Sequence, residues 1–469
     1  MVKRYSWKIW LGFWLAAAVL LAGWYVFLQI KTGNIENLKP FVSLAPFGAE
    51  KRNEINAFMD IYGKIGGFDR PQKGEASGEK NILVLFQNDL ELRPGGGFIG
   101  SFGVVKMKNG KIESVRVFDT GNFDKNIPET EVPPAPLTEI LGTESWKMRD
   151  SNWSPDFKTN AEKAEYFYRL GSVSATDKGG NINAVMAINT SVLNSILAVT
   201  GPVKIDGYPG EYRDENAILQ LEYQVEKGYA EQGIAKAERK NIMEELAGAL
   251  IQNIQGLRYS QQLALAEKAE GHLKQKDIQL FFKDESLQSE IEKLGWAGKI
   301  RNASRSDYLM VIDANLLSLK SDYCIKRKME YRVDFSGNMP QAILNITYEH
   351  TCRAKDWMTS GYRDWLRVYA PKDSALEDAA GQNGDVQVSE ELGKQVFGML
   401  VYVPIGENRT ISLKYQLPQS VNTSEYHLLI QKQSGSGVVP VNISVKYADG
   451  SEKKIQESLT GDREFDFRK

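Results

Sequence analysis

Residues that could bind an anion and a metal ion gather in one stretch of this 469-residue chain. Asp89 and Arg93 follow an apolar segment with the character of a strand, and three glycines come next, Gly95, Gly96 and Gly97. Glycines leave backbone amides bare, and an arginine beside them adds a fixed positive charge. The stretch 81–123 therefore predicts an anion site. The structural alternative is that the glycines only allow a tight turn and the arginine only pairs with a nearby carboxylate.

Composition and spacing narrow the possible ligands. The glycines lack the spacing of either nucleotide-binding loop, because no Lys-Ser or Lys-Thr follows and the next segment is strand-like. Charge is nearly balanced, 58 basic against 60 acidic residues, without a long basic run, so nucleic acid is a poor candidate partner. The three histidines are His272, His350 and His427. They are far apart in sequence, so their spacing supports neither a histidine-rich zinc site nor a Ser-His-Asp triad.

An apolar segment near the N-terminus predicts the location of the chain. Residues 9–28 contain no charge and are long enough to cross a bilayer as a helix. Basic residues precede this run and are sparse after it, so the positive-inside rule keeps the N-terminus in the cytoplasm. We expect a single-pass cell-membrane protein with a cytoplasmic tail (1–8) and an extracytoplasmic bulk. A cleaved signal peptide is the alternative, but no small-x-small site follows closely.

The pattern after the anchor predicts two folded regions. Residues 29–80 form a membrane-proximal segment with a short helix at 50–63 and a polar linker at 71–79. Residues 81–305 mix strands and helices and predict an α/β domain. Residues 306–469 alternate or are β-branched and predict a β-sandwich-like domain of about seven strands.

Within the α/β domain, turn and cap residues set the expected elements. A strand at 82–86 precedes a hairpin, 98–107 with 111–118, around the turn signal Asn109-Gly110. Ser154 caps a helix that runs to about residue 170, with Pro155 in its first turn. Further elements follow at 183–188 (strand), 192–199 (helix), 203–205 (strand) and 236–254 (helix).

The two cysteines fall in the β-rich region. Strands near 323–335 and 341–352 fold about a turn centred on Asn338, and Cys324 and Cys352 are each fourteen residues from it. Without a bulge they face each other within disulfide reach, and an extracytoplasmic setting permits the bond. Two buried free thiols are the alternative, because a bulge would change the register.

Several motifs together resemble a known family. They are the run 87–102 (QNDLELRPGGGFIGSF), 150–157 (DSNWSPDF), 187–189 (AIN), 200–203 (TGPV), 313–315 (DAN), 320–322 (KSD) and 366–371 (LRVYAP). This set resembles the bacterial membrane-anchored domain-of-unknown-function family 4012 over about residues 80–450. That resemblance implies a membrane-anchored envelope protein and assigns no reaction.

A more distant resemblance implies chemistry. The order of strand, arginine-bearing loop, hairpin and helix with Arg239 is similar to the LytR-CpsA-Psr enzymes, which transfer glycopolymers from a lipid pyrophosphate to peptidoglycan. It implies a mixed sheet with helices, Arg93 and Arg239 on phosphate, and Mg²⁺ held by Asp89 or Asp119. Arg93 and Asp89 would then be catalytic, and the three glycines would bind ligand.

This chain departs from that enzyme pattern in two places. After the second hairpin strand it has Asp119-Thr120-Gly121 where the enzymes have an arginine followed by aspartate, and the segment 223–227 (YQVEK) is more acidic. We therefore expect an envelope protein that binds a polyprenyl-linked glycan or a cell-wall polymer without turnover, with an active phosphotransferase as the alternative. Either role requires Arg93, Arg239 and Asp89 to converge on one cleft.

Overall fold

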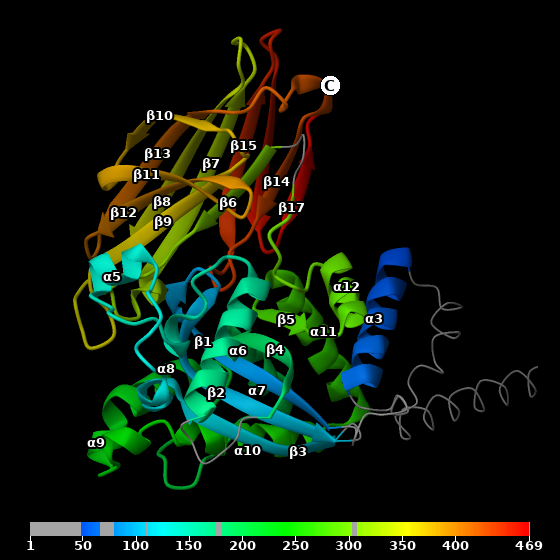
Figure 1. Cartoon of the computed structure of the whole chain (residues 1–469), viewed down its shortest axis with the longest axis vertical. Coiled ribbons are helices and arrows are strands. Elements are labelled where there is room, and N and C mark those ends of the chain that lie inside the picture. The colour runs from blue at the N-terminus through cyan, green and yellow to red at the C-terminus, as the bar shows by residue number, and fades with distance from the viewer. Residues whose placement is uncertain (1–47, 66–78, 109–110, 174–179, 303–306, 469) are drawn as a thin grey trace, which may run out of the picture.

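The computed structural model describes residues 48–65, 79–108, 111–173, 180–302 and 307–468. The expected anchor (9–28), its tail (1–8), the Asn109-Gly110 turn and nearly all of the linker lie outside these ranges. Within them, no helix has the length and apolar character needed to span a membrane. Two regions are stacked along the long axis of the molecule (Figure 1), a mixed α/β region and a region built mostly of β sheets.

The α/β region is built on a five-stranded sheet in the order β3-β2-β1-β4-β5. Only β1 and β4 are parallel neighbours, and the other pairs are antiparallel. The strands are β1 (Glu79–Arg93), β2 (Gly96–Lys108), β3 (Lys111–Asp119), β4 (Ile182–Asn189) and β5 (Ile278–Phe282). The predicted hairpin is therefore confirmed in both strands; β2 is largely buried, whereas β3, at the edge of the sheet, is exposed or half-buried.

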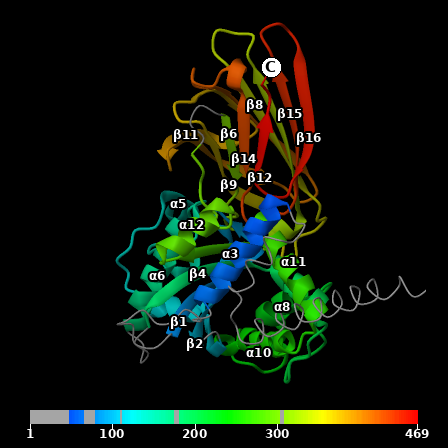
Figure 2. The ribbon, with the colours of Figure 1, turned by 90° about the vertical axis from the view of Figure 1, so that its right-hand side faces the viewer.

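Helices cover both faces of this sheet. One core cluster joins β1 side chains such as Leu83 to α6, and the other joins Ile82 and its neighbours to α11 and α12. Figure 2 shows α3 lying across the outside of this second layer. The α-helices are α3 (Ala49–Ile65), α4 (Thr120–Phe123), α5 (Ala135–Leu141), α6 (Phe157–Val173), α7 (Ser191–Thr200), α8 (Ala217–Tyr223), α9 (Tyr229–Glu231), α10 (Ile242–Gln255), α11 (Tyr259–Gln275) and α12 (Glu285–Lys293).

Three local predictions need correction. Helix α6 begins at Phe157, and its cap is Asp156 rather than Ser154, since the Asp156 carboxylate accepts the Thr159 amide (3.2 Å). Ser154 instead accepts a hydrogen bond from the Asp156 amide. The expected strand at 203–205 is one isolated bridge, and the expected helix at 236–254 begins only at Ile242, after a short 3-10 turn.

The C-terminal region contains twelve strands among the described residues rather than about seven, six in each of two sheets. One sheet has the order β10-β13-β8-β7-β15-β16 and the other β11-β12-β9-β6-β14-β17. Buried side chains from both sheets form one core. The strands are β6 (Asp307–Ile312), β7 (Ile325–Asp334), β8 (Gln341–His350), β9 (Tyr362–Ala370), β10 (Ala375–Ala380), β11 (Asn383–Glu391), β12 (Lys394–Val403), β13 (Asn408–Gln416), β14 (His427–Gln431), β15 (Val439–Lys446), β16 (Glu452–Leu459) and β17 (Arg463–Asp466).

The β7–β8 hairpin carries the two cysteines at its open end. Its register pairs Ile325 with His350, so the residue opposite Cys324 is Thr351 and not Cys352. Thr351 donates its amide to the Cys324 carbonyl (2.8 Å), which closes the ladder there. The chain then turns, and Cys324 and Cys352 form a disulfide with their Cα atoms 5.4 Å apart. The bond therefore lies one step beyond the hairpin instead of across a ladder pair.

Candidate functional site

The acidic residues after the first strand lie in a bulge. The register of β1 against β2 jumps from the pair Asn88–Phe98 to the pair Leu92–Gly97. Asp89, Leu90 and Glu91 are therefore extra residues on one strand, and a bulge of this kind re-aims its side chains away from the sheet faces. This local geometry decides where Asp89 and Glu91 point.

The three glycines are required by close packing. Gly95 donates its amide to the Asn152 carbonyl (2.9 Å), so that amide is occupied. A Cβ on Gly97 would lie 2.0 Å from the Asn88 carbonyl carbon, and one on Gly95 would lie 2.2 Å from the Asn160 side chain. Gly96 has φ +136°, which favours glycine. All three glycines are buried. The structural alternative describes these glycines better than an open anion loop does.

Arg93 is buried, with 3% of its surface exposed. Its guanidinium pairs with Glu91 (2.9 Å) and lies 3.7 Å from the Asp150 carboxylate. It also donates to the backbone carbonyl of Asn315 in the C-terminal region. Burial raises the pKa of Asp150, and the charge of Arg93 opposes that rise. Arg93 is thus enclosed by partners from both regions and does not face solvent.

The residues around Arg93 form the contact between the two regions, which we call the joint. It consists of the bulge and glycines at 89–97, the turn at 152–160, the segment 313–324 and the loop 431–436. Gln433 donates to the Arg93 carbonyl (3.0 Å) and to the Asp313 carbonyl (2.7 Å). Asp322 accepts the Leu92 amide (2.9 Å). Most of the family-like motifs therefore meet in a single interface.

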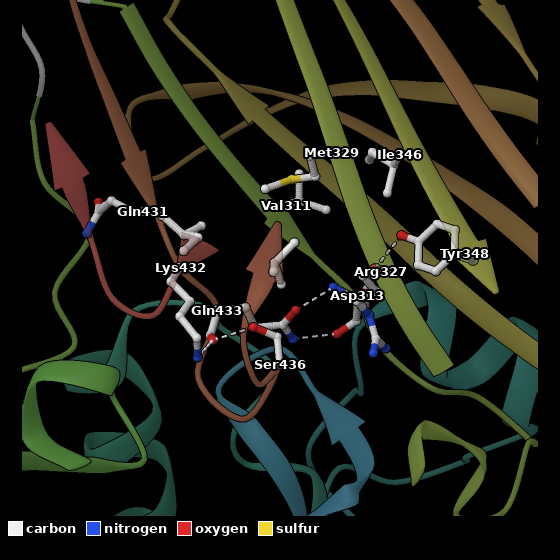
Figure 3. Close-up of a pocket in the computed structure, with 12 residues that line it drawn as sticks. Val311, Asp313, Arg327, Met329, Ile346, Tyr348, Gln431, Lys432, Gln433 and Ser436 are labelled. Atoms are coloured by element: carbon white, nitrogen blue, oxygen red, sulfur yellow. Dashed lines mark hydrogen bonds and ion pairs between the residues drawn. The ribbon is translucent and has the colours of Figure 1, made fainter. Parts of the chain in front are cut away.

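A small cavity beside the joint is lined mainly by the C-terminal region (Figure 3). Arg327 pairs there with Asp313 and Asp322, and Tyr348 donates to Asp313 (2.7 Å). Its volume is about 20 Å³, enough for roughly one water molecule. This cavity is too small for an organic ligand.

Asp89 contacts the start of α7. Its carboxylate accepts a hydrogen bond from the Thr190 hydroxyl, and Gly435 of the C-terminal region packs against it. Burial raises the pKa of Asp89 to about 6, even though Thr190 favours the charged form. Asp89 therefore belongs to the joint as well.

Arg239 lies elsewhere. It donates to Glu226 (2.9 Å), which also pairs with Lys320 (3.2 Å), and its side chain is 23% exposed. Arg93 is paired with different carboxylates and is enclosed. The expected convergence of Arg93, Arg239 and Asp89 on one cleft is not found in the described part of the chain, because the bulge and the C-terminal region close over the first and last of them.

The fourth predicted residue, Asp119, stands beside an open hollow. The hollow has a volume of about 310 Å³, and we call it the β3 hollow. It is lined by Val117, Phe118, Asp119, Asn122, Phe123, Asn126, Tyr168, Ser172, Ala237 and Asn241. Asp119 caps α4 by accepting the Asn122 amide (2.8 Å) and pairs with Lys240 (3.1 Å). Burial lowers the pKa of Lys240, although Asp119 favours its charged form.

Apolar rings form the floor of the β3 hollow. Phe123 stacks on Tyr168 with ring centroids 6.1 Å apart, and Phe118 meets Phe123 at 6.0 Å. Aromatic side chains supply large apolar area at fixed geometry. The hollow therefore combines an aromatic floor with polar side chains, among them Asn241 and Asp119, and Asp119 links it to a cation behind the lining, Lys240.

The described residues do not fit the expected Mg²⁺ site. Mg²⁺ needs oxygen ligands in near-octahedral geometry. Asp89 lies at α7 and Asp119 lies at α4, and each is held by its own partners. No group of three or more acidic, histidine or cysteine side chains is placed to hold a metal among the residues that the structure describes.

A hydrogen-bond chain of Ser, His and Asp occurs although sequence spacing supported no triad. His272 in α11 contacts Asp277 (2.9 Å) through Nδ1 and Ser195 (2.8 Å) through Nε2. Ser195 lies inside helix α7, where its own amide is used by the helix, so it cannot supply the oxyanion donor that a nucleophile's amide often gives. The chain of bonds ties α7 to the end of α11.

The fold defines a two-region protein, with one mixed α/β region and one region built mostly of β sheets. A family model matches part of the α/β region. Residues 77–225 match the model described as "Protein of unknown function (DUF4012)". The matched segment covers β1 to α8 and includes most of the β3 hollow. A comparison with curated proteins found no match.

Solved structures show only remote likeness. The Lin1025 protein from Listeria innocua is 10% identical, with 47% of this chain and 79% of that chain covered and a TM-score of 0.26. An M1 zinc metallopeptidase from Deinococcus radiodurans is 10% identical, with 31% and 40% covered and a TM-score of 0.15. Both TM-scores are too low to support a shared fold or function.

Most residues of the β3 hollow were not predicted from the sequence as site residues. Lys240 directly follows Arg239, and Asn122 and Phe123 directly follow the Asp119 segment, so their positions carried a weak signal. Tyr168 carried none, since it is one aromatic among several on an amphipathic helix.

Proposed function

We propose that this protein is a membrane-anchored, extracytoplasmic cell-envelope protein that binds a lipid-linked phosphate or pyrophosphate glycan precursor in the β3 hollow without turning it over. The observation that carries the proposal is a half-buried cation, Lys240, which pairs with Asp119 in the lining of the hollow and also donates to the Gly100 carbonyl, next to the aromatic floor. The phosphate would take the place of Asp119 on Lys240, and the first part of the lipid would lie on Phe118 and Phe123. The family-like motifs support the envelope setting.

Charge and burial support this division of roles. A buried ammonium with a lowered pKa gains from a doubly charged partner, because charge-assisted hydrogen bonds are stronger in a poorly solvated site. Arg239 lies at the neighbouring position and adds positive potential, although Glu226 already pairs with it. In this proposal Arg93 and the glycines hold the two regions together and do not touch the ligand.

The alternative, an active LytR-CpsA-Psr-like phosphotransferase, has less support. That chemistry needs several cations on the pyrophosphate and a divalent metal. Arg93 is enclosed by the joint, and the carboxylates Asp89 and Asp119 are apart. We therefore favour binding over turnover.

The test of binding uses the full chain purified in detergent, with undecaprenyl phosphate as the probe and undecaprenol as its uncharged match. Lys240→Ala should weaken phosphate binding roughly 10- to 100-fold, the scale of one charge-assisted contact. Lys236→Ala removes an exposed lysine on the same segment and should leave the affinity for undecaprenyl phosphate unchanged. Equal binding of both lipids, or equal affinity in both variants, would contradict the proposal.

Turnover is tested on the same preparation. Incubation with an undecaprenyl pyrophosphate glycan and Mg²⁺ should release no lipid phosphate above the protein-free control. Release that is lost in Arg93→Ala while the variant stays folded would favour the phosphotransferase instead.

The membrane topology is tested separately. A C-terminal alkaline phosphatase fusion is active only when exported, so we expect activity in cells, and loss of it when residues 1–30 are removed. A fusion that is inactive with the intact N-terminus would reject the extracytoplasmic assignment without bearing on the hollow.

A further inference from the structure

We propose that the outer face of the sheet β10-β13-β8-β7-β15-β16 is a second binding site, for a neutral oligosaccharide rich in hydroxyl and amide groups. This site is separate from the β3 hollow and does not depend on it. The face is hollowed, with a volume of about 250 Å³. The hollow is lined by residues of four strands, β7, β8, β15 and β16, and we call it the sheet groove.

Strand register aligns polar side chains into a row across the sheet groove. Asn442 lies opposite Gln456 on one side and Glu330 on the other, Glu330 lies opposite Asn345, and Asn345 lies opposite Ser412. The intervening residues on these strands, such as Tyr331 and Leu344, are buried in the core. Because side chains alternate between faces, the five polar groups share the outer face. Strands lie about 4.8 Å apart, so the row extends for roughly 19 Å.

The side-chain amides in this row have no hydrogen-bond partner among the residues that the structure describes. Asn345, Asn442 and Gln456 hold no side-chain hydrogen bond within the part of the chain that the structure describes, whereas the nearby Thr347 hydroxyl bonds Thr410 (3.0 Å). Asn345 and Asn442 are half-buried, and Gln456 is exposed. Each amide offers both donors and an acceptor, which suits hydroxyl and acetamido groups. Three unsatisfied amides in one hollowed row therefore match a polyol better than an ion.

Charge at the groove is mixed, which argues against a strongly anionic or cationic ligand. Glu330 is paired with Lys328 (2.8 Å), and Lys454 with Glu452 (2.9 Å). Arg332, which lies opposite Ser444 and Ile343, supplies one cation at the side of the row. Ile343 is half-buried and gives a small apolar contact for the face of a sugar ring.

The opposite sheet is covered around β6 and β9. The outer side of β6 and its neighbours is apolar and is covered, with Met310, Ile312 and Tyr369 buried in a cluster that includes Ile300 of the α/β region. The sheet groove lies on the outer face of the other sheet, whose strands β7, β8 and β15 stand in the C-terminal region in Figure 1.

The test titrates the full chain in detergent with two soluble probes, chitotetraose and cellotetraose, which share a β-linked backbone and differ in their acetamido groups. Chitotetraose should bind at least about tenfold more tightly, because amide side chains can pair with the acetamido groups. The double variant Asn345→Ala and Asn442→Ala should lose at least tenfold in affinity. Gln387→Ala removes an exposed amide on β11 of the other sheet and should leave binding unchanged.

Two outcomes would overturn this inference. One is no saturable binding of either saccharide by a chain that still binds undecaprenyl phosphate, which would leave the β3 proposal intact. The other is equal affinity in the double variant and in Gln387→Ala, which would move saccharide binding elsewhere. Far-UV and near-UV circular dichroism confirm that the double variant is folded before either result is interpreted.

Discussion

The joint and the β3 hollow lie along the same edge of one sheet and differ in almost every respect. Asp119 pairs with Ser101 of β2 and Arg93 pairs with Gly96, and these two β2 residues are five positions apart, roughly 16 Å along the strand. The joint contains the distinctive glycines and arginine, all enclosed. The hollow contains ordinary residues around open space. The difference teaches that a distinctive motif can specify an interface between regions, while the space for a ligand lies nearby among less distinctive side chains.

The largest expected effect tests whether the joint is closely packed. Gly97→Ala should cost about 4 kcal/mol or prevent folding, because the new Cβ would meet the Asn88 backbone. Gly248→Ala in α10 meets nothing within 4 Å and should be stabilising by up to about 1 kcal/mol. Urea unfolding measures both. Similar stability of the two variants would show that the joint can accommodate an added methyl group and is not closely packed.

The disulfide fixes the segment that reaches the joint from the C-terminal region. Cys352→Ser removes a link across 28 residues and should cost about 3 to 4 kcal/mol in the chain-entropy model. Binding of undecaprenyl phosphate by the folded variant should not change. Intact mass before and after reduction establishes the bond, and two thiols that alkylate without reductant would contradict it.

Substitutions of Arg93 and Lys240 test directly whether the joint and the β3 hollow have different roles. Arg93→Ala leaves the buried carboxylate of Asp150 and the half-buried carboxylate of Glu91 without this partner and should cost about 3 kcal/mol. Its folded fraction should bind undecaprenyl phosphate normally. Lys240→Ala, in contrast, should keep its stability and bind undecaprenyl phosphate weakly. The denaturation midpoint and the affinity for undecaprenyl phosphate are measured for each of the two variants. The opposite pattern, with binding lost in Arg93→Ala and stability intact, would return the anion site to the glycines.

The smallest expected effect concerns pH. The pKa of Asp89 is raised to about 6 in the folded state, above the usual value of 3.8. Between these values the folded state binds more protons, so its stability falls as the pH rises through this window. Asp89→Asn should remove about 1 to 3 kcal/mol of that fall, measured from unfolding midpoints at pH 4, 5, 6 and 7. Asp307, whose pKa is also raised to about 6, supplies part of the slope that remains. An unchanged slope in Asp89→Asn would place the titration elsewhere.

Local patterns predicted the elements well because they depend on neighbouring residues. The hairpin β2–β3, the strand β4 and the helix α7 follow from alternation, helical spacing and turn residues that stand close together. The cap of α6 was misplaced by two residues because Ser154 and Asp156 both suit that position, and only the Thr159 contact separates them.

The site was harder because its meaning depends on residues far away in sequence. Nothing in the run of three glycines shows whether the space beside them is empty, and it is filled by Asn152 and Asn160. Arg93 meets Asn315, more than two hundred residues later. The number of C-terminal strands was underestimated because short exposed strands such as β10 and β11 have little apolar alternation.

The ring closed by Cys324 and Cys352 has a consequence for proteolysis. The turn between β7 and β8 is exposed at Ser336, Gly337 and Asn338. A protease that cuts there would divide the chain into two pieces that the disulfide still joins. The cut protein would run as a single species in a denaturing gel without reductant and as two fragments with it.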